Sequence, residues 1–136
     1  MKKIILISCV KSKLSHPAKA RDLYISDLFR SSLAYAQSLK PDKIFILSAK
    51  YGLLELDEQI KPYELTLNTM PAAEVKAWSI RVLASLRQKA DLKNDLIIFL
   101  AGDKYRKYLI PELAHYQIPL EGLSFGQQLR EMKRRV

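Results

Sequence analysis

The sequence predicts an α/β fold, a three-layer α/β/α sandwich with a mostly parallel sheet of about four strands and the first strand central. Three apolar runs carry this prediction, at residues 3–8, 43–48 and 96–101. Continuous apolar strands without polar alternation are typical of parallel sheets that are covered on both faces. Helical patterns separate the three runs, and right-handed crossovers then place the first strand between the other two.

The first two intervening helices have recognisable boundaries. Ser26 is suited to cap a helix that Pro41 ends. Pro71 suits the first turn of a second helix, whose apolar positions recur at spacings of three and four through about residue 90. Residues 51–70, with several acids and a proline, are predicted to be irregular.

The last third of the chain predicts shorter elements. Asp103 is placed to cap a short helix after the third strand, and Pro111 interrupts it. Residues 118–120 predict a short edge strand. Ser124 and Gln127 have the spacing of a capping box, so a final helix is expected to start there, with Phe125, Leu129 and Met132 on one apolar stripe.

Length and composition favour one globular domain covering residues 1–136. Hydrophobic residues make up 49% and charged residues 27% of the chain, which is typical of a soluble protein. We expect no membrane span and no signal peptide, because no apolar run approaches the ~20 residues that a bilayer requires. With one cysteine and two histidines, neither an internal disulfide nor a zinc site is expected. The sequence therefore predicts a cytoplasmic protein without a metal or cofactor; its oligomeric state is left open.

Positive charge is concentrated in the first part of the chain. The formal net charge is +9, and residues 1–50 alone carry +7, because ten Lys and Arg residues face three Asp residues. A concentrated excess favours an anionic partner, whose local concentration and association rate it raises. The alternative is that these lysines are solvated surface residues.

The segments that follow the three strands are predicted to form a ligand site. In open parallel sheets, ligands bind outside the carboxyl ends of the strands, near the point where strand order reverses. Each segment combines small or hydroxyl residues with Lys or Arg, which suits an anion, and two add Tyr, which can stack on a base. Asp22 and Tyr24 precede the first helix, where the first crossover passes the same end of the sheet. The expected ligand-binding residues are Lys11, Lys13, Tyr24, Ser48, Lys50, Tyr51, Gly52, Gly102 and Tyr105.

Three residues are candidates for chemistry: Cys9, Asp22 and Glu64. Cys9 could act as a thiolate if neighbouring lysines lower its pKa, although a cysteine at a strand end is commonly a small buried residue. The acids could act as a general base or hold a sugar hydroxyl, and Glu64 belongs to an acid-rich loop long enough to form a lid. Exposed acids in loops are more commonly only solvated.

Motifs along nearly the whole chain resemble an uncharacterised bacterial domain family whose members are described by analogy with the peroxide-stress protein YaaA. The motifs are Cys9-x-Lys11-x-Lys13, Asp22-Leu23-Tyr24-x-Ser26-x-x-Phe29, Leu47-Ser48-Ala49-Lys50-Tyr51-Gly52-Leu53, Pro62-Tyr63, Trp78, Ala101-Gly102-x-x-Tyr105 and Pro119-Leu120-x-Gly122-Leu123-x-x-Gly126-x-x-Leu129. YaaA is associated with DNA binding and protection against oxidative damage. The segment from Cys9 to Lys13 is also loosely similar to a domain of archaeosine synthase, which implies nucleobase or N-glycosidic chemistry.

Three functions follow as hypotheses. The first is an enzyme acting on a nucleotide, a nucleoside or a base within nucleic acid, with lysines holding phosphate and an acid stabilising an oxocarbenium ion or activating water. The second is a non-catalytic DNA- or RNA-binding stress-response module, which the net charge of +9 and the basic C-terminus favour. The third is redox sensing through Cys9, which requires an exposed thiol of low pKa.

Overall fold

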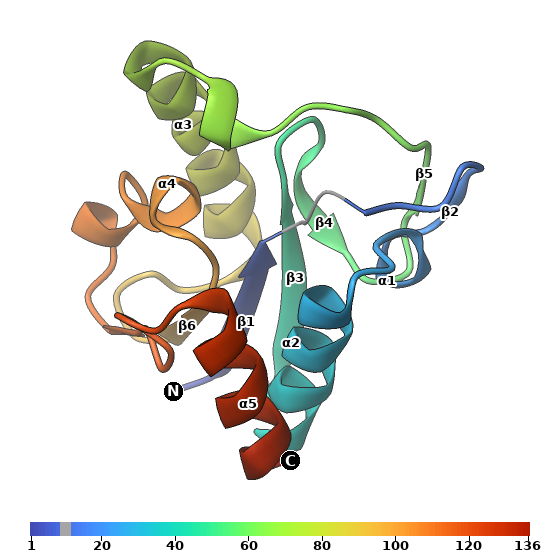
Figure 1. Ribbon diagram of the computed structural model, residues 1–136. Helices are drawn as coiled ribbons and strands as arrows, with labels where there is room; N and C mark the ends of the chain where they lie inside the picture. Colours follow the sequence, from blue (N-terminus) through green and yellow to red (C-terminus); the bar gives the residue numbers. More distant parts are fainter. Residues whose placement is uncertain (9–11) are drawn as a thin grey trace.

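The computed structural model describes residues 1–8 and 12–136, and five of its strands form one sheet in the order β4–β3–β1–β6–β7 (Figure 1). Neighbouring strands are parallel except at β4, which pairs antiparallel with β3. The predicted α/β sandwich and the central first strand are therefore confirmed. The strands are β1 (Lys3–Ser8), β3 (Lys43–Ser48), β4 (Gly52–Glu55), β6 (Leu96–Leu100) and β7 (Tyr116–Gln117).

Strand β1 is buried on both faces, as its apolar sequence predicts. Residues 4–7 are at most 1% exposed. In register, Ile5 pairs with Ile44 of β3 on one side and with Ile98 of β6 on the other. Because helices cover both faces of the sheet, alternate side chains of β1 all enter apolar surroundings.

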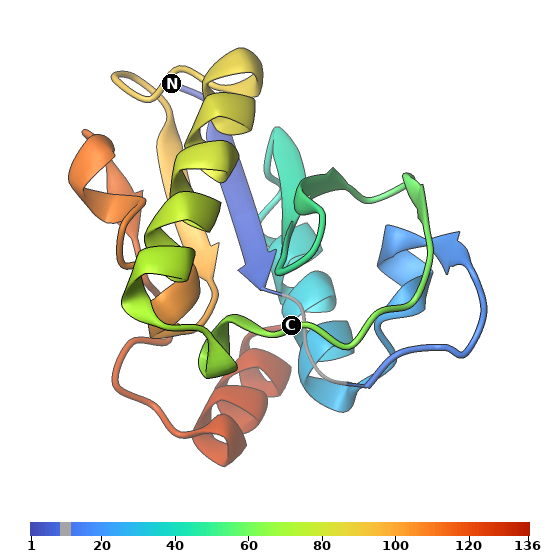
Figure 2. The same cartoon turned by 90° about the horizontal axis from the view of Figure 1, so that it is seen from above.

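Two layers of helices enclose the sheet. Helices α2 (Asp27–Ser38) and α5 (Phe125–Arg135) lie on one face, and α3 (Ala72–Lys89) lies on the other (Figure 2). The predicted boundaries hold: Ser26 Oγ accepts the backbone N–H of Phe29 and caps α2, and Ser124 starts α5 with a complete capping box. The short helices are α1 (Ala20–Leu23), α4 (Asp103–Arg106), η1 (Leu67–Thr69) and η2 (Ile110–Glu112).

The segment predicted to be irregular contains two strands. Strand β4 forms a hairpin with β3, and Gly52 turns the chain there with a φ of +76° that favours glycine. Strand β5 (Gln59–Ile60) pairs antiparallel with β2 (Ala18–Lys19) in a second, two-stranded sheet. Strands of two and four residues are too short for a hydrophobic period to be recognised, so sequence pattern alone missed them.

Three smaller expectations were wrong. The last edge strand lies at 116–117 rather than 118–120. Asp103 is the first residue of α4, and Gly102 precedes it as the N-cap. Phe125 does not share a buried stripe with Met132, because the Phe125 side chain is 74% exposed while Met132 is fully buried. Phe125 is the first residue of α5, and a residue on the apolar side of a helix is buried only where another element lies against it.

The Asp95 side chain connects the segments that precede the central strands β1 and β6. Its carboxylate is 6% exposed and accepts the backbone N–H of Lys2 at 3.0 Å and that of Asp91 at 2.9 Å. The hydrogen bond from Asp91, followed by that from Lys2, holds the pKa of Asp95 below the ordinary aspartate value of 3.8. The carboxylate thus connects the residues before β1 and before β6.

Replacing Asp95 with alanine should lower the free energy of unfolding by about 1–3 kcal/mol at neutral pH, because two backbone N–H groups lose a charged acceptor that belongs to a buried residue. A lowered folded-state pKa contributes stability above pH 3.8, and that contribution disappears as the pH falls through the folded-state value. Urea unfolding of wild type, Asp95→Ala and the exposed-acid control Glu112→Ala at neutral and acid pH measures both effects. Superimposable curves for wild type and Asp95→Ala at neutral pH would contradict this role.

Candidate functional site

Side chains from four separate segments meet beside the carboxyl ends of β1 and β3. We call this group the tyrosine cluster. Its segments are residues 12–14 after β1, residues 23–25 before α2, the β3–β4 turn and the loop that follows β5; in Figure 2 that loop runs across the strand ends toward α3. Backbone hydrogen bonds join the first two segments, from Leu14 to Leu23 and from Ile25 to Ser12. The members of the cluster are Lys13, Tyr24, Ser48, Lys50, Tyr51 and Tyr63.

Hydroxyl groups link the centre of the cluster. Ser48 Oγ donates to the Tyr63 hydroxyl at 2.7 Å, and the Tyr63 and Tyr24 hydroxyls are themselves 2.7 Å apart. The backbone N–H of Tyr51 donates to Ser48 Oγ at 3.0 Å. Ser48 and Tyr24 are at most 1% exposed. Because buried hydroxyl groups require partners, this series of hydrogen bonds fixes the positions of the Tyr24 and Tyr63 side chains.

Ring packing and two cations complete the cluster. The Tyr63 ring lies edge-on to Tyr51 and to Tyr24, with centroids 5.6 and 6.5 Å away. The ammonium group of Lys13 lies 4.6 Å from the Tyr63 ring centroid, and that of Lys50 lies 5.4 Å from the Tyr51 centroid. Attraction to the ring faces positions the two ammonium groups together with the rings. The cluster can therefore offer positive charge beside phenol groups to an anionic ligand.

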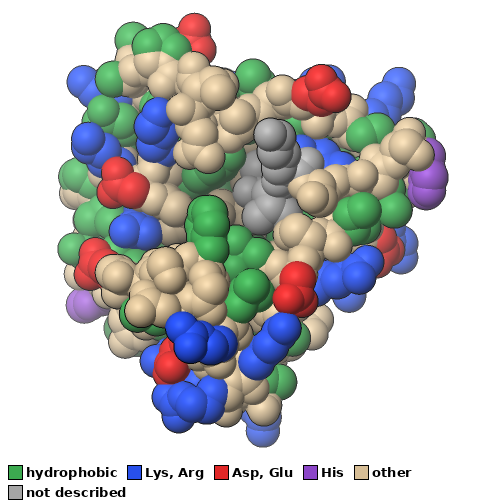
Figure 3. All heavy atoms as spheres, viewed as in Figure 1, with side chains coloured by type: hydrophobic (Ala, Val, Ile, Leu, Met, Phe, Trp, Pro, Cys, Tyr) green, Lys and Arg blue, Asp and Glu red, His purple; other side chains and the backbone are tan. Residues whose placement is uncertain are grey.

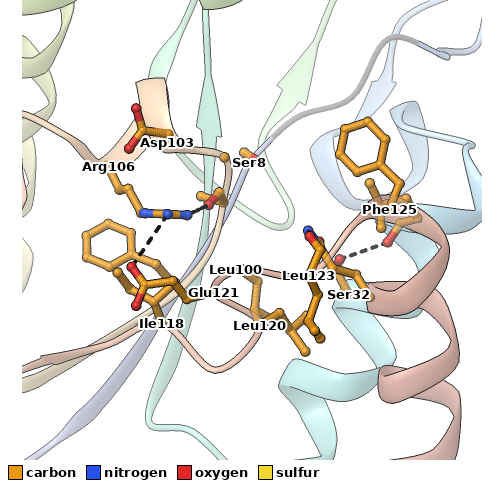
Figure 4. Close-up of a pocket in the computed structure, with 16 residues that line it drawn as sticks. Ser8, Ser32, Leu100, Asp103, Arg106, Ile118, Leu120, Glu121, Leu123 and Phe125 are labelled. Atoms are coloured by element: carbon orange, nitrogen blue, oxygen red, sulfur yellow. Dashed lines mark hydrogen bonds and ion pairs between the residues drawn. The ribbon is translucent and has the colours of Figure 1, made fainter.

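A strand-end cavity of about 220 Å³ lies on the α2 and α5 side of the sheet. Ser8 at the end of β1 and Gly102 after β6 contribute to its lining, and segment 118–123 closes one side of it (Figure 4). The lining is a mixture of apolar and charged side chains. The residues are Ser8, Leu28, Ser32, Phe99, Leu100, Ala101, Gly102, Asp103, Arg106, Ile118, Leu120, Glu121, Gly122, Leu123, Phe125 and Gln128.

Among the described charged side chains that line the cavity, Arg106 is the most enclosed, and a hydrogen bond fixes its position. Its side chain is 16% exposed, and one guanidinium nitrogen donates to the carbonyl oxygen of Ala101 at 2.6 Å. A second nitrogen lies 3.9 Å from a carboxylate oxygen of Glu121. Because that distance exceeds hydrogen-bond length, each group keeps hydrogen-bonding capacity toward a ligand placed between or beside them.

The structure brings several predicted site residues together and separates others. Lys13, Tyr24, Ser48, Lys50 and Tyr51 all belong to the tyrosine cluster. Gly52 is buried next to them in the turn.

Of the remaining predicted residues, Gly102 lines the strand-end cavity instead of the tyrosine cluster. Tyr105 is 5% exposed and packs edge-on against Trp78, with ring centroids 5.6 Å apart, and its hydroxyl accepts the Leu67 N–H at 3.5 Å. The Tyr105 ring therefore lies in the core.

The three candidates for chemistry are placed as follows. Asp22 is exposed in α1, and Glu64 is exposed directly after Tyr63; neither lines the strand-end cavity. Cys9 lies outside the described residues, as does the predicted ligand residue Lys11. Across residues 1–8 and 12–136, no three His, Cys, Asp or Glu side chains gather closely enough to hold a metal ion. Nor does any helix in those residues combine the length and apolar character needed to cross a bilayer.

Sequence reasoning missed several residues that the structure places at these sites. Tyr63 is the centre of the tyrosine cluster, and its only sequence signal was membership of the Pro62-Tyr63 motif. Asp103 and Arg106 are three positions apart immediately after β6, which was a usable signal, since helical neighbours at that spacing share one side. Glu121 had no comparable signal, because it lies in a turn between two elements.

The fold and these two sites define a class: a three-layer α/β/α protein with a polar, tyrosine-rich surface at the carboxyl ends of its parallel strands. A family model matches residues 4–134, and the chain belongs to that family, DUF6884, a family of unknown function. The match names neither YaaA nor archaeosine synthase. No curated protein matches the chain.

The hydroxyl chain predicts energetic coupling between Tyr24 and Tyr63. Each Tyr→Phe substitution removes one partner of the same bond, so the double variant should lose less stability than the sum of the single losses. A coupling of about 0.5–1.5 kcal/mol is expected from urea unfolding of the four proteins in the cycle. Tyr116→Phe, in the exposed edge strand β7, is the matched control. Strictly additive losses would show that the two hydroxyls do not stabilise one another.

Proposed function

We propose that this protein binds a nucleotide, free or within nucleic acid, at the carboxyl-end surface of its sheet. The observation that carries the proposal is the tyrosine cluster, in which Lys13 and Lys50 are positioned over phenol rings. An ammonium group neutralises phosphate, and a phenol offers both a hydrogen-bonding group and a ring face. Both kinds of group occur together where strand order reverses from β3 to β6 around β1, the usual ligand position of such sheets.

The proposal extends to catalysis on a nucleobase or an N-glycosidic bond. Such cleavage develops positive charge on the sugar and needs an acid that stabilises it or activates water. Asp103 and Glu121 line the strand-end cavity, which Asp22 and Glu64 do not, so we assign this role to the first pair. The resemblance of the Cys9-to-Lys13 segment to a domain of archaeosine synthase supports the same chemistry. We place this activity in the cytoplasm, where a lone cysteine stays reduced.

The alternative is a non-catalytic DNA- or RNA-binding module, which the likeness to YaaA and the net charge of +9 favour. Lys and Arg side chains gather at the end of the molecule where α5 ends (Figure 3). These cations have structural partners, however. Lys133 pairs with Asp27 of α2 at 3.1 Å, Arg134 and Arg135 pair with Glu131, and Arg135 also donates to the Tyr35 hydroxyl. Lys133 and Arg135 join α5 to α2. All three cations belong to the last turn of α5, whereas Phe125 and Gln128, which line the strand-end cavity, belong to its beginning.

Calorimetric titration with 5′-mononucleotides and the matching nucleosides tests the proposal. Lys13→Ala and Lys50→Ala should each weaken mononucleotide binding about tenfold, equivalent to about 1.4 kcal/mol, and should affect nucleosides less, because nucleosides carry no phosphate. Lys93→Ala, exposed in the turn before β6, is the matched control. The proposal fails if no mononucleotide binds at millimolar concentration, or if the two variants bind as wild type does.

Salt dependence separates the two functions. A module that binds along the phosphate backbone should lose affinity for a 20-mer steeply as salt rises, with a slope set by the number of neutralised phosphates. A site for one nucleotide should show a slope equivalent to one or two charges. Release of free base from nucleosides or oligonucleotides, followed by chromatography, measures catalysis. A backbone-type slope without mononucleotide binding would favour the alternative.

A further inference from the structure

We infer that the strand-end cavity is a binding site for one unpaired nucleobase, which it reads along the Watson–Crick edge. The inference rests on the proposed function and deepens it, since it separates free nucleotides and single strands from duplexes. Its central observation is the pair of Arg106 and Glu121, which lie side by side in a partly enclosed cavity without hydrogen-bonding to each other.

The size of the cavity limits the ligand. At about 220 Å³, it is smaller than the ~300–1,000 Å³ that is usual for drug-sized ligands and cofactors. A single base fits this range better than a dinucleotide does. Apolar side chains form the floor, among them Phe99, Leu100 and Leu120, which are 1–7% exposed. An apolar floor suits the flat face of a heterocycle and leaves recognition to the charged rim.

The charged rim matches the edge of a base. The guanidinium group of Arg106 can only donate hydrogen bonds, and the carboxylate of Glu121 can only accept them. Their nearest nitrogen and oxygen atoms are 3.9 Å apart. Every nucleobase has an acceptor beside a donor on its Watson–Crick edge. The acceptor and the donor of such an edge can form two diverging hydrogen bonds, one with Arg106 and one with Glu121.

A hydrogen bond within the protein already fixes the orientation of the Arg106 side chain. The bond to the Ala101 carbonyl fixes one end of the guanidinium group, so that binding costs little side-chain entropy. Asp103, three positions earlier in α4, adds a second carboxylate acceptor to the same side of the cavity (Figure 4). The bases with an exocyclic amino group can donate to it.

The described side chains on the opposite side of the cavity are neutral. Figure 4 shows Phe125 and Ser32 across the cavity from Arg106. The amide nitrogen of Gln128 donates to the Leu123 carbonyl at 2.9 Å, which leaves the amide oxygen of Gln128 as an acceptor. Phe125 is 74% exposed at the rim. An exposed aromatic ring beside a cavity is a stacking surface for a neighbouring base or for the sugar of the bound nucleotide.

The cavity adjoins the tyrosine cluster through the sheet. Ser8 lines the cavity and pairs in register with Leu47, the residue before Ser48 of the cluster. Neighbouring strands are ~4.8 Å apart, so the two sites begin on adjacent strand ends. A base in the cavity and a phosphate at the cluster therefore belong to one strand-end surface. In a duplex the Watson–Crick edge is occupied by the partner strand, so a base must be unpaired to use this site.

The test compares 5′-mononucleotides with ribose 5-phosphate, and single-stranded with duplex 12-mers, by calorimetry. We expect mononucleotides to bind at least about tenfold more tightly than ribose 5-phosphate, and single strands more tightly than duplexes. Glu121→Gln and Arg106→Lys should remove most of the preference over ribose 5-phosphate and leave ribose 5-phosphate binding unchanged. Glu112→Gln, an exposed acid outside the cavity, is the matched control. Phe125→Ala, a surface change that leaves the core intact, should weaken single-strand binding.

The outcomes distinguish this inference from the proposed function. If mononucleotides bind and depend on Lys13 and Lys50, but Glu121→Gln and Arg106→Lys leave the base preference intact, the cavity does not read the base. Equal binding of duplexes and single strands, unaffected by these substitutions, would overturn the inference in the same way. If nothing that contains phosphate binds, the proposed function fails; nucleoside binding that depends on Glu121 would then still support the cavity as a base site.

Discussion

The hydrogen bond from the Trp78 indole to the Ser48 carbonyl is the interaction on which the strand-end surface depends. It is 2.8 Å long, and both residues are at most 1% exposed. Because a buried indole N–H needs a partner, the bond fixes α3 to the point where β3 ends. The other side of the contact is the Tyr105 ring, which lies edge-on to Trp78. One side chain of α3 thus connects the segment after β3 with the helix after β6.

Fixing Ser48 also fixes the tyrosine cluster. The side chain of Ser48 joins the Tyr51 backbone to the Tyr63 hydroxyl, while its carbonyl is held by Trp78. The loop that carries Tyr63 has no regular structure of its own between β5 and η1. Its position is set by hydroxyl bonds and ring contacts instead of a backbone ladder. A loop held in this way can keep a precise arrangement of side chains and still adjust locally when a ligand binds.

The sequence alone predicted the sheet and the main helices because their signals are local. Three long apolar runs define the central strands, and Ser26, Pro71 and Ser124 mark helix starts. The rest depends on contacts between distant residues. Tyr63 meets Ser48 across 15 positions and Tyr24 across 39, and Arg106 meets Glu121 only because segment 118–123 folds back over α4. Position after a strand correctly grouped Ser48, Lys50 and Tyr51, but it could not show that the Tyr105 ring is packed against Trp78.

The two sites carry different charged side chains, and the net charge of the protein does not show this difference. The net charge of +9 suggests one basic surface, yet the lining of the strand-end cavity, as far as residues 1–8 and 12–136 form it, has two acids, Asp103 and Glu121, beside one cation, Arg106. At the other site, the ammonium groups of Lys13 and Lys50 lie over the tyrosine rings. Phosphate favours the second environment, and a neutral heterocycle with donors and acceptors favours the first. This division matches the two ends of a nucleotide, and it explains why a count of basic residues cannot by itself distinguish binding of a nucleotide from binding of a nucleic-acid backbone.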